Sequence, residues 1–365
     1  MSCYLLPTIW LRVRRRVLYV KLHLCQRWSF MSLGLIKTYP RLWSLESGIA
    51  MVVTDLHGDW DAYQRYRDRF VDLYANGQVD WLIFTGDLIH GESTTEPDKS
   101  VEIVLDVLAL QRAYGLVVIY LCGNHEMPHI YDISLAKGKK DYTPAFEAAL
   151  SRTQRRAEVV TLFDSLPFYI RTRSGVSLAH SGADMVMTNP KNMLKIFNWS
   201  HQDLLNSADK ILAEEDVAAL RRAYARLNLA SSYDDLAKHY LAVSGPEDPR
   251  YDHLLRGFLA TATSSFELLW AVLFTRCEEA YGQTDYAIFL DAMLKELSVD
   301  FFPQQVLVAG HMIVPKGHKI VAQRHLRLAS AGHARPREAG RYLIFDAAQP
   351  IQAVRDLLAG LENVY

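Results

Sequence analysis

The feature that most constrains this chain is a series of short apolar runs that each stop at a glycine or an aspartate. Between the early runs lie stretches with helical periodicity at 59–76, 98–113 and 144–165. Alternating strands and helices predict parallel pairing early in the chain, whereas later runs joined by short turns predict antiparallel or mixed pairing. The predicted strands are 47–55, 79–87, 116–124, 167–171, 176–182, 305–311, 319–330 and 341–346.

Residues 202–298 differ from the rest because they are polar, helix-patterned and nearly free of strand signals. We interpret this region as a helical insertion or cap within one α/β domain, with a loop at 244–250. The expected organisation is an N-terminal extension over 1–46, a domain over 47–346 and a C-terminal tail over 347–365.

The first 30 residues are rich in arginine and lysine and contain no carboxylate. Arg12 to Arg16 interrupt the apolar residues, so this stretch cannot supply a membrane-spanning helix, and it lacks the order of a secretory signal. A basic helix on a membrane surface is one alternative. The others are a poorly ordered extension or translated upstream sequence with the start at Met31, and we expect no contribution to the fold.

The net charge and the cysteine spacing bear on which partners and which cellular location are expected. The formal net charge is −1, so no general attraction to nucleic acid or membranes is expected. The four cysteines form no Cys-x-x-Cys pair, which favours a reducing, cytoplasmic location.

The stretch LVVIYLCGNHEM (116–127) shows an unusual ending for an apolar strand, because an amide, an imidazole and a carboxylate follow its glycine. Such groups are costly to bury unless they bind something. Ligands in open α/β sheets bind beyond the carboxyl ends of strands, so polar groups at several strand ends should converge. The mixture of carboxylate, amide and imidazole suits Mn²⁺, Fe or Zn²⁺. The residues at these ends are Asp55, His57, Asp87, Asn124, His125, His180 and His311.

Five segments in this order, D-x-H, G-D, G-N-H-E, H and G-H, resemble the calcineurin-like metallophosphoesterase superfamily. The resemblance is greatest to the serine/threonine phosphoprotein phosphatase branch and its bacterial relatives, and it covers about 47–200 and 300–346. It implies a four-layer α/β/β/α sandwich of two mixed β-sheets, with a helical insertion at about 202–298.

The same resemblance implies two divalent or transition metal ions, either Mn²⁺ or an Fe/Zn pair. It implies that Asp87 bridges the ions, that a metal-bridging hydroxide attacks phosphorus, and that His125 protonates the leaving alkoxide as a general acid. The first ion would be held by Asp55 and His57, and the second by Asn124, His180 and His311.

The second segment departs from the family pattern G-D-x-V-D-R-G. His90 stands where an aspartate normally orients the catalytic imidazole, and the arginine that grips phosphate is missing. His90 and Glu126 are candidates for groups that support the ligands. Arg276 resembles a phosphate-gripping arginine of bacterial relatives, although an arginine at the end of an amphipathic helix is commonly solvated or salt-bridged.

The last motif also departs from the superfamily's G-H-x-H. Met312 and Ile313 follow His311, so the resemblance implies one protein ligand fewer on the first ion. Three histidines near the last strands match no motif, and we interpret them as surface or hydrogen-bonded residues: His318, His325 and His333.

The resemblance implies a metal-dependent phosphoester hydrolase, and the expected activity is that of a protein-phosphatase-like phosphomonoesterase acting on a phosphoprotein or a small phosphoester. The expected partners exclude nucleic acid and stable membrane insertion. A nucleotidyl phosphohydrolase or phosphodiesterase, of the diadenosine polyphosphate or cyclic nucleotide type, is the second reading. A non-catalytic scaffold is the third, and it would be expected to have lost ligands.

Overall fold

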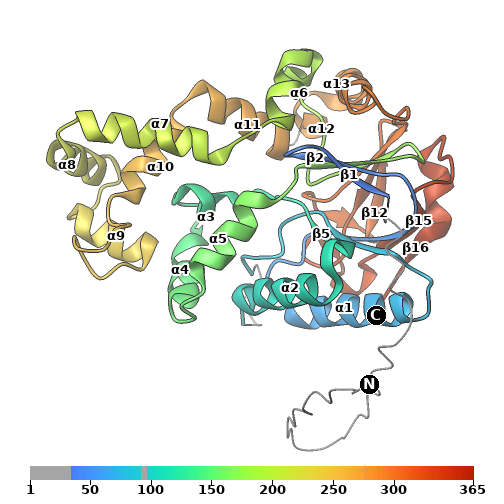
Figure 1. The fold of residues 1–365 in the computed structure, drawn as a ribbon, viewed down its shortest axis with the longest axis horizontal. Coiled ribbons are helices and arrows are strands. Elements are labelled where there is room, and N and C mark those ends of the chain that lie inside the picture. The colour runs from blue at the N-terminus through green and yellow to red at the C-terminus, as the bar shows by residue number, and fades with distance from the viewer. Residues whose placement is uncertain (1–33, 92–96, 276) are drawn as a thin grey trace, which may run out of the picture. The chain divides into compact units, whose positions relative to one another are not determined.

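The computed structural model describes residues 34–91, 97–275 and 277–365, so the predictions made for residues 1–33 lie outside it. Its strands form two main sheets (Figure 1). The seven-stranded sheet has the order β1 (Leu35–Tyr39), β2 (Leu42–Leu45), β8 (Tyr169–Thr172), β9 (Val176–Ala179), β10 (Val306–Ala309), β13 (His325–Leu328) and β12 (His318–Val321). The five-stranded sheet has the order β16 (Leu361–Glu362), β15 (Tyr342–Asp346), β3 (Ile49–Val53), β4 (Trp81–Phe84) and β5 (Val118–Tyr120).

Two short ladders complete the strands, namely β6 (Ala136–Lys137) with β7 (Lys140–Asp141), and β11 (Val314–Pro315) with β14 (Ala334–Arg335). The α-helices of the described residues are α1 (Trp60–Ala75), α2 (Ser100–Tyr114), α3 (Met127–Tyr131), α4 (Thr143–Ser151), α5 (Arg156–Ser165), α6 (Pro190–Phe197), α7 (His201–Glu214), α8 (Val217–Leu227), α9 (Tyr233–Leu241), α10 (His253–Thr261), α11 (Ser264–Phe274), α12 (Cys277–Ala280) and α13 (Gly282–Leu297). Single 3₁₀ turns occur at Gly115–Val117, Met185–Thr188 and Arg337–Ala339, and a longer one at Val354–Gly360.

Strand alternation explains the layers. Ala50 and Val52 of β3 join an apolar cluster that contains strand residues of both sheets, so this cluster lies between the sheets. Met51 and Val53 point the other way and pack with the buried faces of the helices. Both sheets contain parallel and antiparallel pairs. The arrangement confirms the predicted α/β/β/α sandwich of two mixed sheets.

The early βαβ units form as expected. Asp59 caps α1 by accepting a hydrogen bond from the Ala62 N–H at 3.0 Å, and the helix buries one stripe that includes Tyr63, Tyr66 and Phe70. This stripe returns the chain to the sheet, where β3, β4 and β5 pair in parallel. Their carboxyl ends therefore meet at one edge.

Three boundaries differ from the expectations. The strands β1 and β2 lie inside the stretch 1–46 that was assigned to an extension, and β2 pairs with β8. The run 319–330 is a hairpin of β12 and β13, because Ala322 and Gln323 adopt left-handed backbone angles that turn the chain. The helical stretch 144–165 divides into α4 and α5 around Gln154, which is also left-handed.

The region 202–298 has two parts. Residues of α8, α9 and α10 contribute to a small apolar cluster of their own, whereas α11 and α13 contribute to the main core. Figure 1 shows α7 to α10 beside α3, α4 and α5, away from β15 and β16. After β15, Val354 and Leu357 are buried between the sheets. Among the described helices none is by itself long and apolar enough to cross a membrane, and α10 with α11 meets that test only as a pair bent by 79°.

Candidate metal centre

The polar side chains predicted at five strand ends lie together at one edge of the sheets. Contacts between strand ends show this: the His180 and His311 imidazoles are 3.0 Å apart, and His57 lies 3.9 Å from Asp87. All are buried except Asn124, which is partly exposed. The group consists of Asp55 and His57 after β3, Asp87 after β4, Asn124 and His125 after β5, His180 after β9 and His311 after β10.

The backbone at these strand ends is strained. Asp55, His57, Asp87 and His311 have φ angles of 39°, 46°, 52° and 70°, a left-handed region that side chains with a Cβ rarely adopt. Such strain is typical of functional sites, where it aims side chains at a common point. Gly310 allows the close approach of its strand end, because a Cβ there would collide with Asp55 Oδ2.

The first cluster of potential ligands contains Asp55, His57 and His333. His333 Nδ1 lies 3.2 Å from Asp55 Oδ1, and the rings of His57 and His333 are 4.7 Å apart. Asp55 Oδ1 also accepts the His311 N–H at 2.8 Å. His57 also belongs to a neighbouring group of potential ligands, with Asp87 and His125.

His333 is therefore a site residue that the sequence analysis missed, because we assigned it to the surface or hydrogen-bonded histidines. It is 4% exposed and faces the first cluster. A signal was present in the sequence. Ala331-Gly332-His333 repeats the Ala309-Gly310-His311 triplet at the end of the neighbouring parallel strand.

The second cluster contains Asp87, His180 and His311, with Asn124 beside them. His180 Nε2 lies 3.3 Å from Asp87 Oδ2 and 3.0 Å from Asn124 Oδ1. The other His180 nitrogen, Nδ1, donates to the Thr85 carbonyl at 2.9 Å, which leaves the Nε2 lone pair directed into the cluster. Asp87 therefore belongs to this cluster and also to the group with His57 and His125.

The charge balance of these clusters fits bound cations. Asp55 Oδ2 and Asp87 Oδ2 are buried and have no hydrogen-bond donor among the residues that the structure describes. Two such carboxylate oxygens are costly to bury unless cations compensate them. The donors present therefore suit metal ions.

His125 faces the same space from a different position. Its backbone N–H donates to Asp87 Oδ1 at 3.0 Å, and its Nε2 lies 3.9 Å from Asp87 Oδ2. Its Nδ1 lies 3.0 Å from His90 Nδ1. Burial first, and then the imidazoles of His57 and His90, lower the pKa of His125. The ring nitrogen nearest the clusters is therefore Nε2.

Glu126 joins two strand ends. Its carboxylate accepts the N–H groups of Asp87, Leu88 and Gly123 at 3.1, 3.2 and 2.8 Å, and the Tyr120 hydroxyl at 2.6 Å. Burial and the Asp87 carboxylate raise the pKa of Glu126 to about 7. Glu126 therefore supports the backbone that carries Asp87, in line with the supporting role considered for it.

A cavity of about 320 Å³ opens at this edge. The β6–β7 hairpin forms one of its walls, and Lys137 is exposed there. The cavity therefore joins the potential metal ligands to a cationic side chain. Its lining residues are Asp87, Asn124, His125, Leu135, Ala136, Lys137, Tyr142, His311 and His333.

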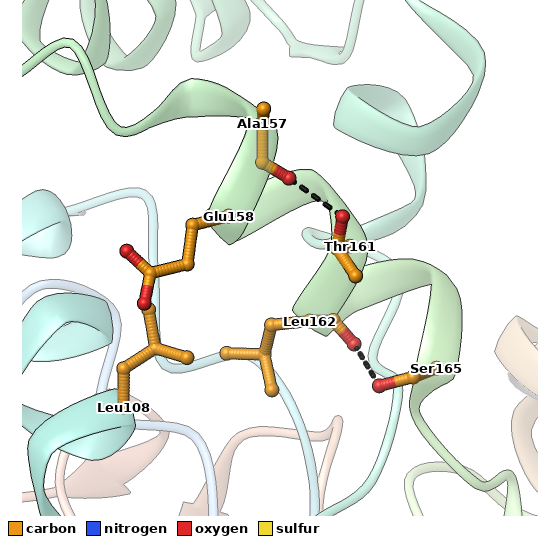
Figure 2. Close-up of a pocket in the computed structure, with 6 residues that line it drawn as sticks. All are labelled: Leu108, Ala157, Glu158, Thr161, Leu162 and Ser165. Atoms are coloured by element: carbon orange, nitrogen blue, oxygen red, sulfur yellow. Dashed lines mark hydrogen bonds between the residues drawn. The ribbon is translucent and has the colours of Figure 1, made fainter.

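A second hollow lies between α2 and α5 (Figure 2). Within α5 the hydroxyls of Thr161 and Ser165 donate to the carbonyls of Ala157 and Leu162, as the dashed lines show. Glu158, which also lines it, pairs with arginine side chains. The polar side chains that line this hollow are therefore already hydrogen-bonded or ion-paired with neighbouring residues. The hollow is separate from the strand ends that carry the potential metal ligands.

Arg276, the predicted phosphate-binding residue, lies outside the described residues. Its described neighbour Thr275 accepts a hydrogen bond from the Ser181 hydroxyl at 2.9 Å through its carbonyl. The Phe274 ring lies 6.0 Å from the His180 ring. The end of α11 therefore contacts the strand that carries His180.

Solved structures that match the chain include several phosphatases. A protein serine/threonine phosphatase from Saccharomyces cerevisiae is 14% identical, with a TM-score of 0.42 over 81% of this chain and 72% of that chain. A cold-active protein-tyrosine phosphatase from a psychrophilic Shewanella species is 14% identical, with a TM-score of 0.44 over 86% and 82%. A metallophosphoesterase from Sphaerobacter thermophilus is 14% identical, with a TM-score of 0.35 over 86% and 93%. No curated protein matches the chain significantly.

The family model described as calcineurin-like phosphoesterase matches residues 50–257, which is more than half of the chain. The matched range contains the strand ends after β3, β4, β5 and β9. It also contains the G-D and G-N-H-E segments. The chain therefore belongs to the calcineurin-like phosphoesterase family.

Proposed function

We propose that the protein is a metal-dependent phosphomonoesterase with two metal ions, acting on phosphate esters whose leaving group is an alcohol. The observation that carries this proposal is that Asp87 belongs to two groups of potential ligands, one with His57 and His125 and one with His180 and His311. A single carboxylate that serves two groups of imidazoles is the arrangement expected for paired cations.

The first ion would be held by Asp55, His57 and His333, and the second by Asn124, His180 and His311, with Asp87 common to both. Mn²⁺ or an Fe/Zn pair suits these donors. When bound, such ions supply positive charge that stabilises the transferred phosphoryl group and lowers the pKa of water. Asp55 and Asp87 would neutralise only part of that charge, so the site favours a phosphate dianion.

His125 would protonate the leaving oxygen through Nε2, which faces the clusters. In the balanced reaction, one water and one phosphate ester give one alcohol and one phosphate. Lys137 would attract the substrate from the wall of the cavity. The arginine that follows the G-D segment in the family pattern is absent from this chain.

The proposal is tested by a substrate panel on metal-saturated protein, together with elemental analysis. The panel contains an alkyl phosphate, a phosphopeptide, p-nitrophenyl phosphate, its bis-ester and diadenosine tetraphosphate. We expect hydrolysis of the monoesters and about two metal ions per chain. Preferential cleavage of the bis-ester or the dinucleotide would overturn the monoesterase assignment, and a stoichiometry of one or less would overturn the paired ions.

The role of His125 is tested on the same panel. His125→Asn should keep the metal content and lower turnover of an alkyl phosphate by roughly 10²–10⁴-fold, the usual range for a general acid. The loss with p-nitrophenyl phosphate should be smaller, because that leaving group needs no proton. Equal losses would contradict proton donation.

A further inference from the structure

A chain of three buried histidines runs from the candidate site to a buried carboxylate. His125 Nδ1 lies 3.0 Å from His90 Nδ1, and His90 Nε2 lies 2.9 Å from His129 Nε2. His129 Nδ1 lies 2.7 Å from Glu147 Oε1. All four residues are at most 7% exposed. Each nitrogen of His90 and His129 is thereby used within the chain.

Glu147 is ionised at the far end. Burial favours its neutral acid, but the hydrogen bond from His129 and the guanidinium of Arg156 outweigh it, so the pKa of Glu147 is lowered. Arg156 Nε donates to Glu147 Oε2 at 2.7 Å, and Arg250 Nη1 lies 3.7 Å from the same oxygen. Because a carboxylate only accepts, His129 Nδ1 must carry the hydrogen.

The remaining directions follow from charge and valence. The ionic cluster around Glu147 also contains Asp132 and three guanidiniums, of Arg156, Arg250 and Arg256, and the last two pair further with Asp248 and Asp209. With its Nδ1–H donated to Glu147, the neutral tautomer of His129 carries no hydrogen on Nε2, which accepts from His90 Nε2–H. Neutral His90 then accepts at Nδ1.

The last hydrogen bond of the chain is therefore donated by His125 Nδ1–H. This leaves His125 Nε2 as the nitrogen that faces the metal ligands. His125 Nε2 can also take up a proton without breaking the chain, because the imidazolium form of His125 keeps the same Nδ1–H bond to His90.

We propose that Glu147 is a positioning residue that fixes the tautomer and orientation of His125 through His129 and His90. The proposal deepens the proposed function, on which it rests for the role of His125. It also gives the helical region a part in the site, because Arg250 and Arg256 come from the segment that contains α10 and its preceding loop.

The variant Glu147→Gln tests the direction of the chain. Arg156 Nε needs an acceptor, so the amide oxygen should take the place of Oε2 and the NH₂ group should face His129 Nδ1. His129 would then accept at Nδ1, and each later hydrogen bond would reverse. His125 would meet an N–H of His90, which opposes the imidazolium that donates a proton.

Nuclear magnetic resonance of the zinc-loaded protein with ¹⁵N-labelled histidine reads the tautomers directly. We expect hydrogen on Nδ1 of His125, Nε2 of His90 and Nδ1 of His129 in the wild type, and the opposite nitrogens in Glu147→Gln. Hydrogen on Nε2 of His125 in the wild type, or tautomers unchanged by the substitution, would overturn the proposal. This readout requires no turnover, so it decides the proposal even if the wild type hydrolysed no phosphate ester, a result that would overturn the proposed function alone.

Turnover gives the second readout. Glu147→Gln should lower kcat for an alkyl phosphate by roughly 10–100-fold, the usual cost of losing a group that orients a functional histidine. The loss for p-nitrophenyl phosphate should be clearly smaller. Equal losses on the two esters would show a merely structural role and overturn the proposal.

Asp132→Asn is the matched control. Asp132 belongs to the same ionic cluster, through Arg156 at 2.5 Å and Arg256 at 3.2 Å, but it does not contact the histidine chain. Its φ of 53° is one that asparagine tolerates. Asp132→Asn should lower stability and leave both the tautomers and the ratio of the two kcat values unchanged. If it reversed the tautomers like Glu147→Gln, general disturbance of the cluster would explain the effect and the proposal would fail.

Discussion

The imidazole of His333 and the carboxylate of Asp55 lie 3.2 Å apart, between Nδ1 and Oδ1. The two residues follow strands of different sheets, His333 after β13 and Asp55 after β3. His57 lies against both, so the first ligand cluster has one imidazole more than the motifs alone implied.

We predict that His333→Ala weakens binding of one of two metal ions by at least about tenfold, since even groups that only support ligands contribute that much. A Mn²⁺ titration of chelated protein should show one site unchanged and one weakened. His325→Ala is the control, because His325 is also buried but bonds to the Tyr286 hydroxyl at 2.6 Å. Two unchanged sites in His333→Ala would exclude His333 as a ligand.

Asp87→Asn should harm turnover more than Asp55→Asn. Asp87 lies within 3.9 Å of both His57 and His180, and an amide cannot neutralise two cations. The loss should persist at saturating Mn²⁺, because the substitution would change the charge that Asp87 offers to both groups of ligands as well as the metal affinity. Recovery of near-wild-type kcat in excess Mn²⁺ would show that Asp87 binds a single ion.

Lys137→Ala should raise KM about fivefold and leave kcat nearly unchanged, because an exposed charge contributes about 1 kcal/mol to attraction of an anion. The difference should shrink as salt is added. Lys139, on the same hairpin but away from the lining of the cavity, provides the control variant Lys139→Ala. An equal KM for both variants and the wild type would remove Lys137 from substrate binding.

Residues that follow strands directly could be placed from the sequence, and those in loops could not. Asp55, Asp87 and His180 were predicted at one edge because apolar runs and parallel pairing fix where strands end. His333 was missed because it follows β13, which lay inside a run interpreted as one strand instead of a hairpin. The contact of His90 with His129 could not be predicted from the sequence either, because it depends on how α3 packs.

The strands β1 and β2 were missed for a related reason, and they make a prediction about truncation. Leu42 and Leu45 are fully buried, and Arg41 donates to the Trp199 and Leu166 carbonyls at 3.0 and 2.8 Å. Deleting 1–30 should leave the melting temperature unchanged. Deleting 1–46 should prevent folding, because two buried leucines alone contribute about 3–6 kcal/mol of a total stability near 5–15 kcal/mol.

Circular dichroism of the two truncated chains gives the measurement. Loss of structure on removing 1–30 would mean that the stretch packs on the domain. A cooperative unfolding transition in the chain that begins at 47 would show instead that β2 is dispensable.

The last prediction concerns pH and Asp132. Burial opposes its ionisation, but the His253 hydrogen bond and the guanidiniums of Arg156 and Arg256 outweigh this and lower the pKa of Asp132 to about 2. Because the folded pKa lies below the unfolded value of 3.8, the ionised group stabilises the fold above about pH 4, and this contribution is lost as pH falls towards 2. It amounts to about 2 kcal/mol, from roughly 1.4 kcal/mol per pKa unit.

Urea unfolding of the wild type and of Asp132→Asn at pH 5, 4 and 3 should therefore show a stability difference that falls with pH, by about 1 kcal/mol between pH 5 and pH 3. The other acidic groups titrate in both proteins, so the difference reports Asp132. A difference that stayed constant over this range would mean that the Asp132 pKa is not lowered and that its ion pairs contribute little in the folded protein.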